Sequence, residues 1–148
     1  MRSWRALAQS ACCCLALVAC GREPTAPAPL DGTYILVAIN NAMPPQTIWV
    51  GETDTLRLDS ARIDLAADGK GQYMVAQALI VPLSGGGRQV TSWRSSYAIR
   101  FARLPDRVVL TFDPRLELLP DTLRVEPTGL TDSIRVGGRT SFIGFLRL

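Results

Sequence analysis

The side chains that could do chemistry are few. The chain contains no His, which excludes a Ser-His-Asp triad and a Cys-His pair as nucleophiles. Paired carboxylates could still act as general acid and base, and four Asp lie close together in the sequence: Asp54, Asp59, Asp64 and Asp68. The alternation of polar and apolar residues predicts that Asp59 and Asp64 face solvent, and Asp68 falls in a turn. We therefore expect no catalytic residues, with a carboxylate-dependent hydrolase as a remote alternative.

Metal and phosphate sites are not predicted either. Glu52-Thr53-Asp54 lacks the ligand spacing of a calcium loop. Gly85-Gly86-Gly87 lacks the Lys-Ser/Thr pair and the following helix of a phosphate-binding loop. We expect no metal and no cofactor, and we interpret the glycine stretch as a flexible connection.

Aromatic side chains are the better candidates for binding, because Tyr and Trp combine apolar surface with a polar group. Five of them could line a ligand: Tyr34, Trp49, Tyr73, Trp93 and Tyr97. We prefer the interpretation that they pack the protein core, because small eight-stranded barrels are often just wide enough for side chains to fill.

A cluster of arginines could engage anionic lipid or polysaccharide: Arg88, Arg94, Arg100, Arg103 and Arg107. The alternation places Arg94 and Arg100 on the face away from Trp93, so we interpret the cluster as part of a solvated outer face, with anionic binding as the alternative.

The first nineteen residues have the organisation of a secretory signal. Arg2 and Arg5 precede the apolar stretch Ala6–Ala19, which is shorter than the roughly 20 residues that span a bilayer. The tetrapeptide Leu17-Val18-Ala19-Cys20 resembles the lipobox of bacterial lipoprotein precursors. The resemblance implies cleavage before Cys20 and attachment of fatty acids such as palmitate to Cys20. An ordinary secretory signal that releases the protein is the alternative.

Cleavage at this position would simplify the chain. Cys12, Cys13 and Cys14 would be removed, and Cys20 would be consumed by the lipid, so no disulfide framework is expected. Loss of Arg2 and Arg5 would leave 14 basic against 13 acidic side chains, a balance that gives no reason to expect nucleic acid as a partner. The stretch 20–30 is rich in Pro and Ala, which predicts an extended tether. Residues 31–148 then form a single domain.

The domain has the pattern of an all-β protein. Short apolar runs are separated by Gly, Pro, Asp and Asn, with no long stretch of helical period. Asp68-Gly69 predicts a hairpin turn, and a change of apolar parity predicts a bulge near Ser60. Three segments share the order Asp, hydroxyl residue, aliphatic, Arg, aliphatic, which we interpret as strand starts with the Asp in the turn: Asp54–Leu58, Asp121–Val125 and Asp132–Val136.

About eight strands predict an antiparallel meander that closes into a small barrel, with a β-sandwich as the alternative. The order of features is similar to that of bacterial lipocalin-like lipoproteins. The corresponding stretches are Gly32–Asn40 with Pro44-Pro45, Leu65–Gly69, Ser95–Phe101 and Phe142–Leu148. Asn41 stands where that pattern has Gly, and Asn also adopts left-handed geometry.

These features predict a lipid-anchored protein of the bacterial envelope. The residues after Cys20 are Gly21 and Arg22. In the Gram-negative lipoproteins that this segment resembles, an Asp at that place retains the protein in the inner membrane. The resemblance therefore implies the outer membrane, with the domain in the periplasm or displayed at the surface. The expected function is non-catalytic binding of a small apolar ligand or an envelope protein. The alternatives are a structural or accessory lipoprotein with a filled barrel and, remotely, an envelope hydrolase.

Overall fold

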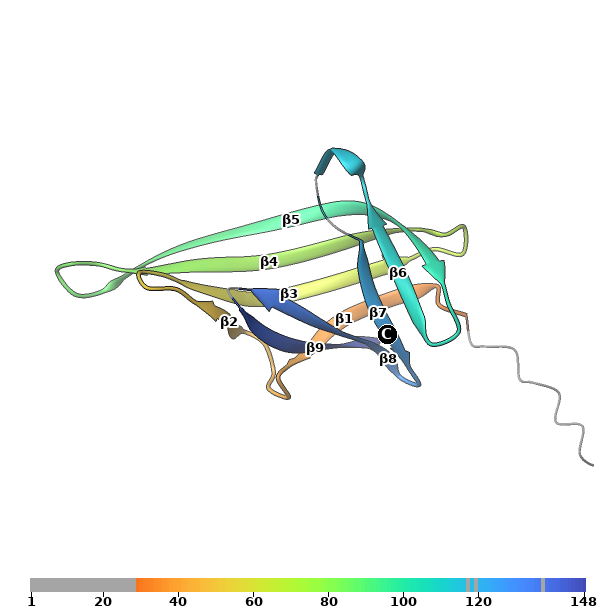
Figure 1. The fold of residues 1–148 in the computed structure, drawn as a ribbon, viewed down its shortest axis with the longest axis horizontal. Helices are drawn as coiled ribbons and strands as arrows, with labels where there is room; N and C mark the ends of the chain where they lie inside the picture. Colours follow the sequence, from red (N-terminus) through yellow and green to blue (C-terminus); the bar gives the residue numbers. More distant parts are fainter. Residues whose placement is uncertain (1–28, 117, 119, 137) are drawn as a thin grey trace, which may run out of the picture.

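The structure, a computed structural model, describes residues 29–116, 118, 120–136 and 138–148. These residues form nine β-strands and one short 3-10 helix (Figure 1). In chain order they are β1 (Gly32–Ile39), β2 (Gln46–Val50), β3 (Thr55–Leu65), β4 (Lys70–Pro82), β5 (Arg88–Arg103), β6 (Arg107–Phe112), η1 (Pro114–Leu116), β7 (Asp121–Glu126), β8 (Gly129–Val136) and β9 (Arg139–Arg147).

Eight of the strands close into an antiparallel barrel. From β3 to β9 each strand pairs with the next, β9 pairs with β1, and β1 returns to β3 through the register Gly32↔Leu65 to Ile35↔Arg62. The ninth strand, β2, pairs only with the first part of β3. Closure leaves no free edge along most of the ring. The predicted closed barrel is thus confirmed, and the sandwich alternative is wrong.

The turns follow the predicted chemistry. Gly69 has φ 79° in the β3–β4 hairpin, where its lack of a Cβ makes that conformation accessible. The predicted bulge lies between Leu58 and Ser60, where β3 slips by one residue against β4. Even-numbered residues of β3 face the interior before the slip and odd-numbered residues after it, so Leu58 and Ala61 are both buried. Asn41, at φ 65°, adopts the left-handed geometry expected for it.

The two ends of the barrel differ. The chain enters at Pro29 at the end that carries the β3–β4, β5–β6 and β7–β8 turns, which we call the proximal end (Figure 1). The opposite, distal end carries the β4–β5 turn, far from the point of entry.

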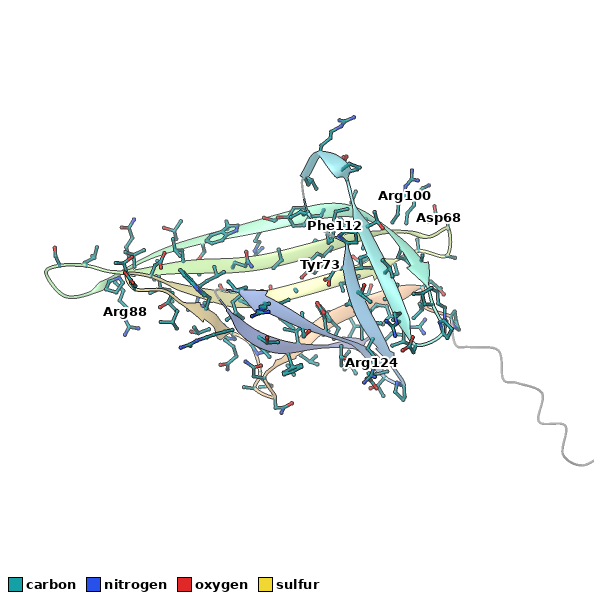
Figure 2. The ribbon with its side chains drawn as sticks, viewed as in Figure 1. Asp68, Tyr73, Arg88, Arg100, Phe112 and Arg124 are labelled. Carbon is teal, nitrogen blue, oxygen red and sulfur yellow. The ribbon has the colours of Figure 1, made fainter. Side chains whose placement is uncertain are left out.

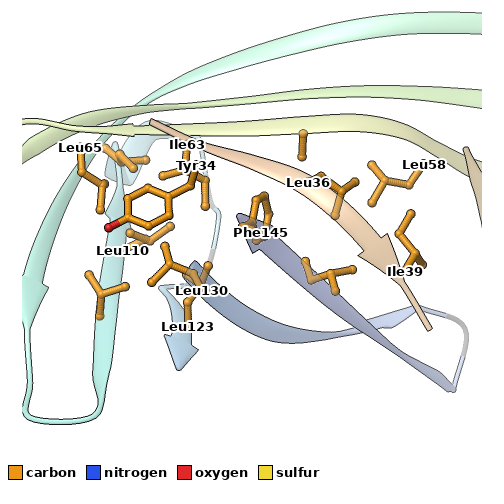
Figure 3. Packing of buried hydrophobic residues seen from close by; sticks show 14 of the residues in the cluster. Tyr34, Leu36, Ile39, Leu58, Ile63, Leu65, Leu110, Leu123, Leu130 and Phe145 are labelled. Carbon is orange, nitrogen blue, oxygen red and sulfur yellow. The ribbon is translucent and has the colours of Figure 1, made fainter. Parts of the chain in front are cut away.

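One hydrophobic cluster lies inside the barrel (Figure 3). Its largest fully buried members come from β1, β3, β6, β7 and β8: Tyr34, Ile39, Ile63, Leu110, Leu123, Leu130 and Val108. Most of these side chains alternate with more accessible ones along their strands, as a sheet with one dry face requires. Burial of this continuous cluster provides the main driving force for folding.

The ends of the described chain meet at the proximal end. The Arg147 guanidinium donates to the carbonyls of Pro29, at 2.8 Å, and of Asp31. The Leu148 N–H donates to the Thr33 carbonyl at 2.9 Å. The two ends of the described chain are therefore held side by side at the same end of the barrel.

Candidate functional site

The predicted ligand-lining residues do not all come together. Tyr34 is 2% exposed, and its hydroxyl donates to the Leu30 carbonyl at 2.9 Å, which makes it a core residue at the proximal end. Tyr73 and Tyr97 lie opposite each other on β4 and β5, with ring centroids 6.5 Å apart. Both rings contact Phe112 of β6, at 6.1 and 6.0 Å between centroids. Two of the five predicted residues therefore share an interior aromatic group with Phe112, which the sequence did not single out.

The two tryptophans lie elsewhere. Trp49 is half-buried on β2, opposite Leu56 of β3. Trp93 is 38% exposed on β5, at the edge of a surface hollow that Asp59 and Ser60 also line. A ligand-binding role for the five aromatics stays a prediction. Cys20, the predicted lipidation site, lies outside the described residues.

The structure brings together two carboxyl groups that the sequence interpretation missed. Asp121 and Asp132 are strand residues on β7 and β8, so the assignment of these Asp to turns was wrong. In the ladder Asp121 lies opposite the buried Leu110, and Asp132 lies opposite the buried Ile143. Because directly opposite residues share a face, both carboxyl groups face the interior. The signal was the two-residue alternation: each Asp has the parity of the aliphatics that follow it.

Burial and the neighbouring Asp121 raise the pKa of Asp132 to about 6. One carboxylate oxygen of Asp132 accepts the Ser133 N–H at 2.6 Å, and the other, Oδ2, is buried without a partner. A proton on Asp132 would let this oxygen donate to Asp121. Burial, together with the charges of both Asp, raises the pKa of the Tyr73 hydroxyl. The pair can therefore share a proton or hold a cationic group, and it is the place in the described chain where a carboxylate-dependent reaction could be sought.

The four carboxylates considered from the sequence have other surroundings. Three are bound to basic neighbours close in sequence: Asp59 to Arg57, Asp64 to Arg62 at 2.9 Å, and Asp68 to Lys70 at 3.0 Å. Asp54, the fourth, follows β2 in the β2–β3 turn, where its carbonyl accepts the Gly51 N–H. Within the described residues, no three His, Cys, Asp or Glu side chains are grouped so as to hold a metal ion.

The outer face of β9 carries a groove. Phe142, Gly144 and Leu146 alternate along this face, and the glycine leaves a notch between two exposed apolar side chains, of which Phe142 is 67% exposed. Two hollows of about 530 and 460 Å³ meet at Gly144 and share Thr131. We call their union the outer groove; its lining is Val37, Ala38, Asn41, Thr122, Arg124, Glu126–Ser133 and Phe142–Leu146.

The rim of the outer groove is fixed by the β1–β2 connection. Asn40 has φ 50°, and in this conformation its amide oxygen accepts the Phe142 N–H at 2.9 Å while its amide nitrogen donates to Ser141 at 3.3 Å. Arg124 and Glu126 contribute opposite charges to the lining, and Thr122, Thr131 and Ser133 contribute hydroxyl groups. Figure 2 shows Arg124 on the wall formed by β7. The groove therefore combines apolar rims with charges of both signs.

No family model, no curated protein and no solved structure matches this chain. None of the described segments is a helix of the length and apolar character that would span a bilayer.

Proposed function

We propose that this chain is a lipid-anchored, non-catalytic binding module of the bacterial envelope that engages a protein partner through the outer groove. The observation that carries the proposal is the exposed Phe142 at the rim of a groove on the outer face, around a barrel whose interior is occupied by one hydrophobic cluster. A large aromatic side chain in water is informative when it borders a concave surface.

The expected anchor agrees with the shape of the domain. Leu17-Val18-Ala19-Cys20 supports lipidation at Cys20, and the closed antiparallel meander supports the resemblance to lipocalin-like lipoproteins. The described chain begins at the proximal end, so a tether there would leave the sides of the barrel accessible.

The composition of the groove favours a peptide segment as the occupant. A partner side chain can enter the notch at Gly144 between Phe142 and Leu146. Arg124 can bind a carboxylate of the segment, and Glu126 a basic group. Apolar anchors surrounded by polar groups are typical of protein interfaces.

Photo-crosslinking tests the groove. We expect p-benzoylphenylalanine at position 142, in the lipid-anchored chain in its native cells, to give a discrete crosslinked product. The product should disappear when Gly144→Val fills the notch. The variant should fold, because a Cβ at Gly144 would meet only the Ala38 Cβ, at 3.7 Å, and β-branched residues suit strands.

The control places the photo-reactive residue at Thr111, which is exposed on β6 away from the groove. Equal crosslinking from positions 111 and 142, or a product that persists with Gly144→Val, would refute the groove as the binding site. Lipidation is tested separately: labelled palmitate should mark the wild type and not Cys20→Ala.

The interior carboxyl pair favours a second candidate function, the binding of a small apolar ligand that ends in an amine. Asp132 presents a buried oxygen without a partner close to Tyr73, whose ring belongs to the aromatic group. Native mass spectrometry should then detect dodecylamine in preference to dodecanoate, and Asp132→Asn should abolish that preference. Equal retention of the two compounds by the wild type would exclude this candidate.

A further inference from the structure

The longest strand of the barrel has a free edge. β5 pairs with β4 along Arg88–Arg100, but β6 covers its other edge only along Ile99–Arg103. Residues 88–98 therefore have a strand on one side and none on the other within the described chain. Figure 1 shows this part of β5 lying beside β4 and beyond β6, on the way to the distal end.

The direction of the unused backbone groups follows from one hydrogen bond. The Phe101 N–H donates to the Gly69 carbonyl on the β3–β4 side at 2.9 Å. Backbone direction alternates along a strand, so odd-numbered residues of β5 bond toward β4. The N–H and C=O groups of the even-numbered residues then point out from the free edge: Val90, Ser92, Arg94, Ser96 and Ala98.

Most of the features that usually protect an edge strand are absent from β5. β5 contains no proline, and thirteen consecutive residue pairs join it to β4 without a bulge. Every residue from Arg88 to Arg94 is exposed. The one protective feature present is charge, supplied by Arg88 and Arg94.

That charge is not balanced locally. Residues 70–103 contain five basic and no acidic side chains, whereas the rest of residues 20–148 contains nine basic and thirteen acidic ones. The carboxylates of β3 and its turn are engaged by Arg57, Arg62 and Lys70. Arg88 and Arg94 have no carboxylate partner among the described residues. Glu52 and Asp54 belong to the β2–β3 turn, on the far side of β4 from this edge.

We propose that the free edge of β5, residues 88–98, is a strand-addition site for an extended acidic segment of a partner protein. The backbone of the segment bonds to the even-numbered residues, and its carboxylates lie beside Arg88 and Arg94. Pairing with a second copy of the chain is disfavoured, because it would bring two hairpins of the same charge together. This edge is separate from the outer groove, so the two sites can be tested independently.

Peptide binding tests the proposal on residues 20–148 with Cys20→Ser. The probes are two fluorescent peptides of about ten residues, one with alternating Glu and Val and the other with alternating Lys and Val, compared by anisotropy at low salt. We expect the Glu peptide to bind at least tenfold more tightly. Ser92→Pro removes an N–H that β4 does not use, so it should fold and weaken binding at least tenfold. The matched control Ser92→Ala keeps this N–H and should change binding less than twofold.

Charge reversal provides a second variant that does not depend on tolerance of proline. Arg88→Glu with Arg94→Glu should reverse the preference between the two peptides. The same change at Arg135 and Arg139, exposed on β8 and β9, should leave the preference intact. Equal binding of both peptides, Glu-peptide binding that survives Ser92→Pro in a folded protein, or a dimer of the wild type that Ser92→Pro dissociates would each overturn the proposal.

Discussion

Asp132→Asn should stabilise the protein at neutral pH and leave its stability unchanged near pH 4. The folded protein holds a proton on Asp132 up to a pKa of about 6, whereas the ordinary value is 3.8. A folded-state pKa above the unfolded one contributes stability that is fully present below about pH 4 and is lost as pH rises through 6. At pH 7.5 the Asp132 carboxylate is ionised beside Asp121, which lowers the free energy of unfolding.

The size of the effect follows from that difference in pKa. About two pKa units correspond to about 3 kcal/mol of unfolding free energy. Asp132 is only partly buried, and solvent screening reduces the expected effect to about 1–1.5 kcal/mol. Asn has the same shape and no charge, and its amide N–H can donate to Asp121. The unfolding free energy of Asp132→Asn should therefore exceed that of the wild type by this amount at pH 7.5 and equal it at pH 4.

Urea unfolding of residues 20–148 with Cys20→Ser, followed by the fluorescence of Trp49 and Trp93, measures this difference across pH. The control is Asp64→Asn, which makes the same chemical change on the outer wall and removes the negative charge from the group whose oxygen accepts hydrogen bonds from Thr33, at 2.6 Å, and from Arg62. It should destabilise the protein at pH 7.5. A stability difference between Asp132→Asn and wild type that does not change with pH, or a less stable variant at pH 7.5, would refute the interior carboxyl pair as described.

Three further predictions concern single contacts. A Cβ at Gly129 would overlap the Phe145 carbonyl oxygen, so Gly129→Ala should cost about 2 kcal/mol or more in chemical unfolding, whereas the matched Gly144→Ala should be close to neutral. Tyr34→Phe keeps the ring and removes the hydrogen bond to the Leu30 carbonyl, which should lower stability by about 1 kcal/mol in the same assay. An unchanged unfolding midpoint would argue that water replaces the hydroxyl. Arg147→Met should release Pro29 and Asp31, which limited proteolysis would detect as faster cleavage before β1, with cleavage in the β4–β5 turn unchanged.

Local rules in the sequence predicted much of the barrel. Alternation located the buried face of β3, including its change of parity near Ser60, and Asp68-Gly69 located a hairpin. The sequence could predict a closed barrel as a type of fold, but not the strand pair that closes it. The β1–β3 pairing joins residues some thirty positions apart, and it depends on tertiary packing. The free edge of β5 depends on how far β6 extends, which no residue of β5 itself determines.

The candidate sites show where local interpretation fails. Asp is typical of turns, and this preference hid the fact that Asp121 and Asp132 share the parity of buried aliphatics. Phe142 and Leu146 are apolar residues of a terminal strand, and side chains of this type usually pack in the interior, although here they face outward across the notch at Gly144. In both cases the side chain contradicts the ordinary preference of its type, which is where function is most often found.

The meeting of the chain ends at the proximal end has a practical consequence for engineering. Because Leu148 bonds to Thr33 and Arg147 bonds to Pro29, a short peptide could join the ends while new ends are opened at Gly86 in the β4–β5 turn. Such a circular permutant would keep every strand pair of the barrel, and its new chain ends would lie at the distal end. A reporter fused to Leu148 would lie beside Pro29, whereas one inserted at Gly86 would project from the distal end. If the chain is anchored at Cys20 as we propose, comparing the two fusions in living cells would measure how far each end of the barrel stands from the membrane.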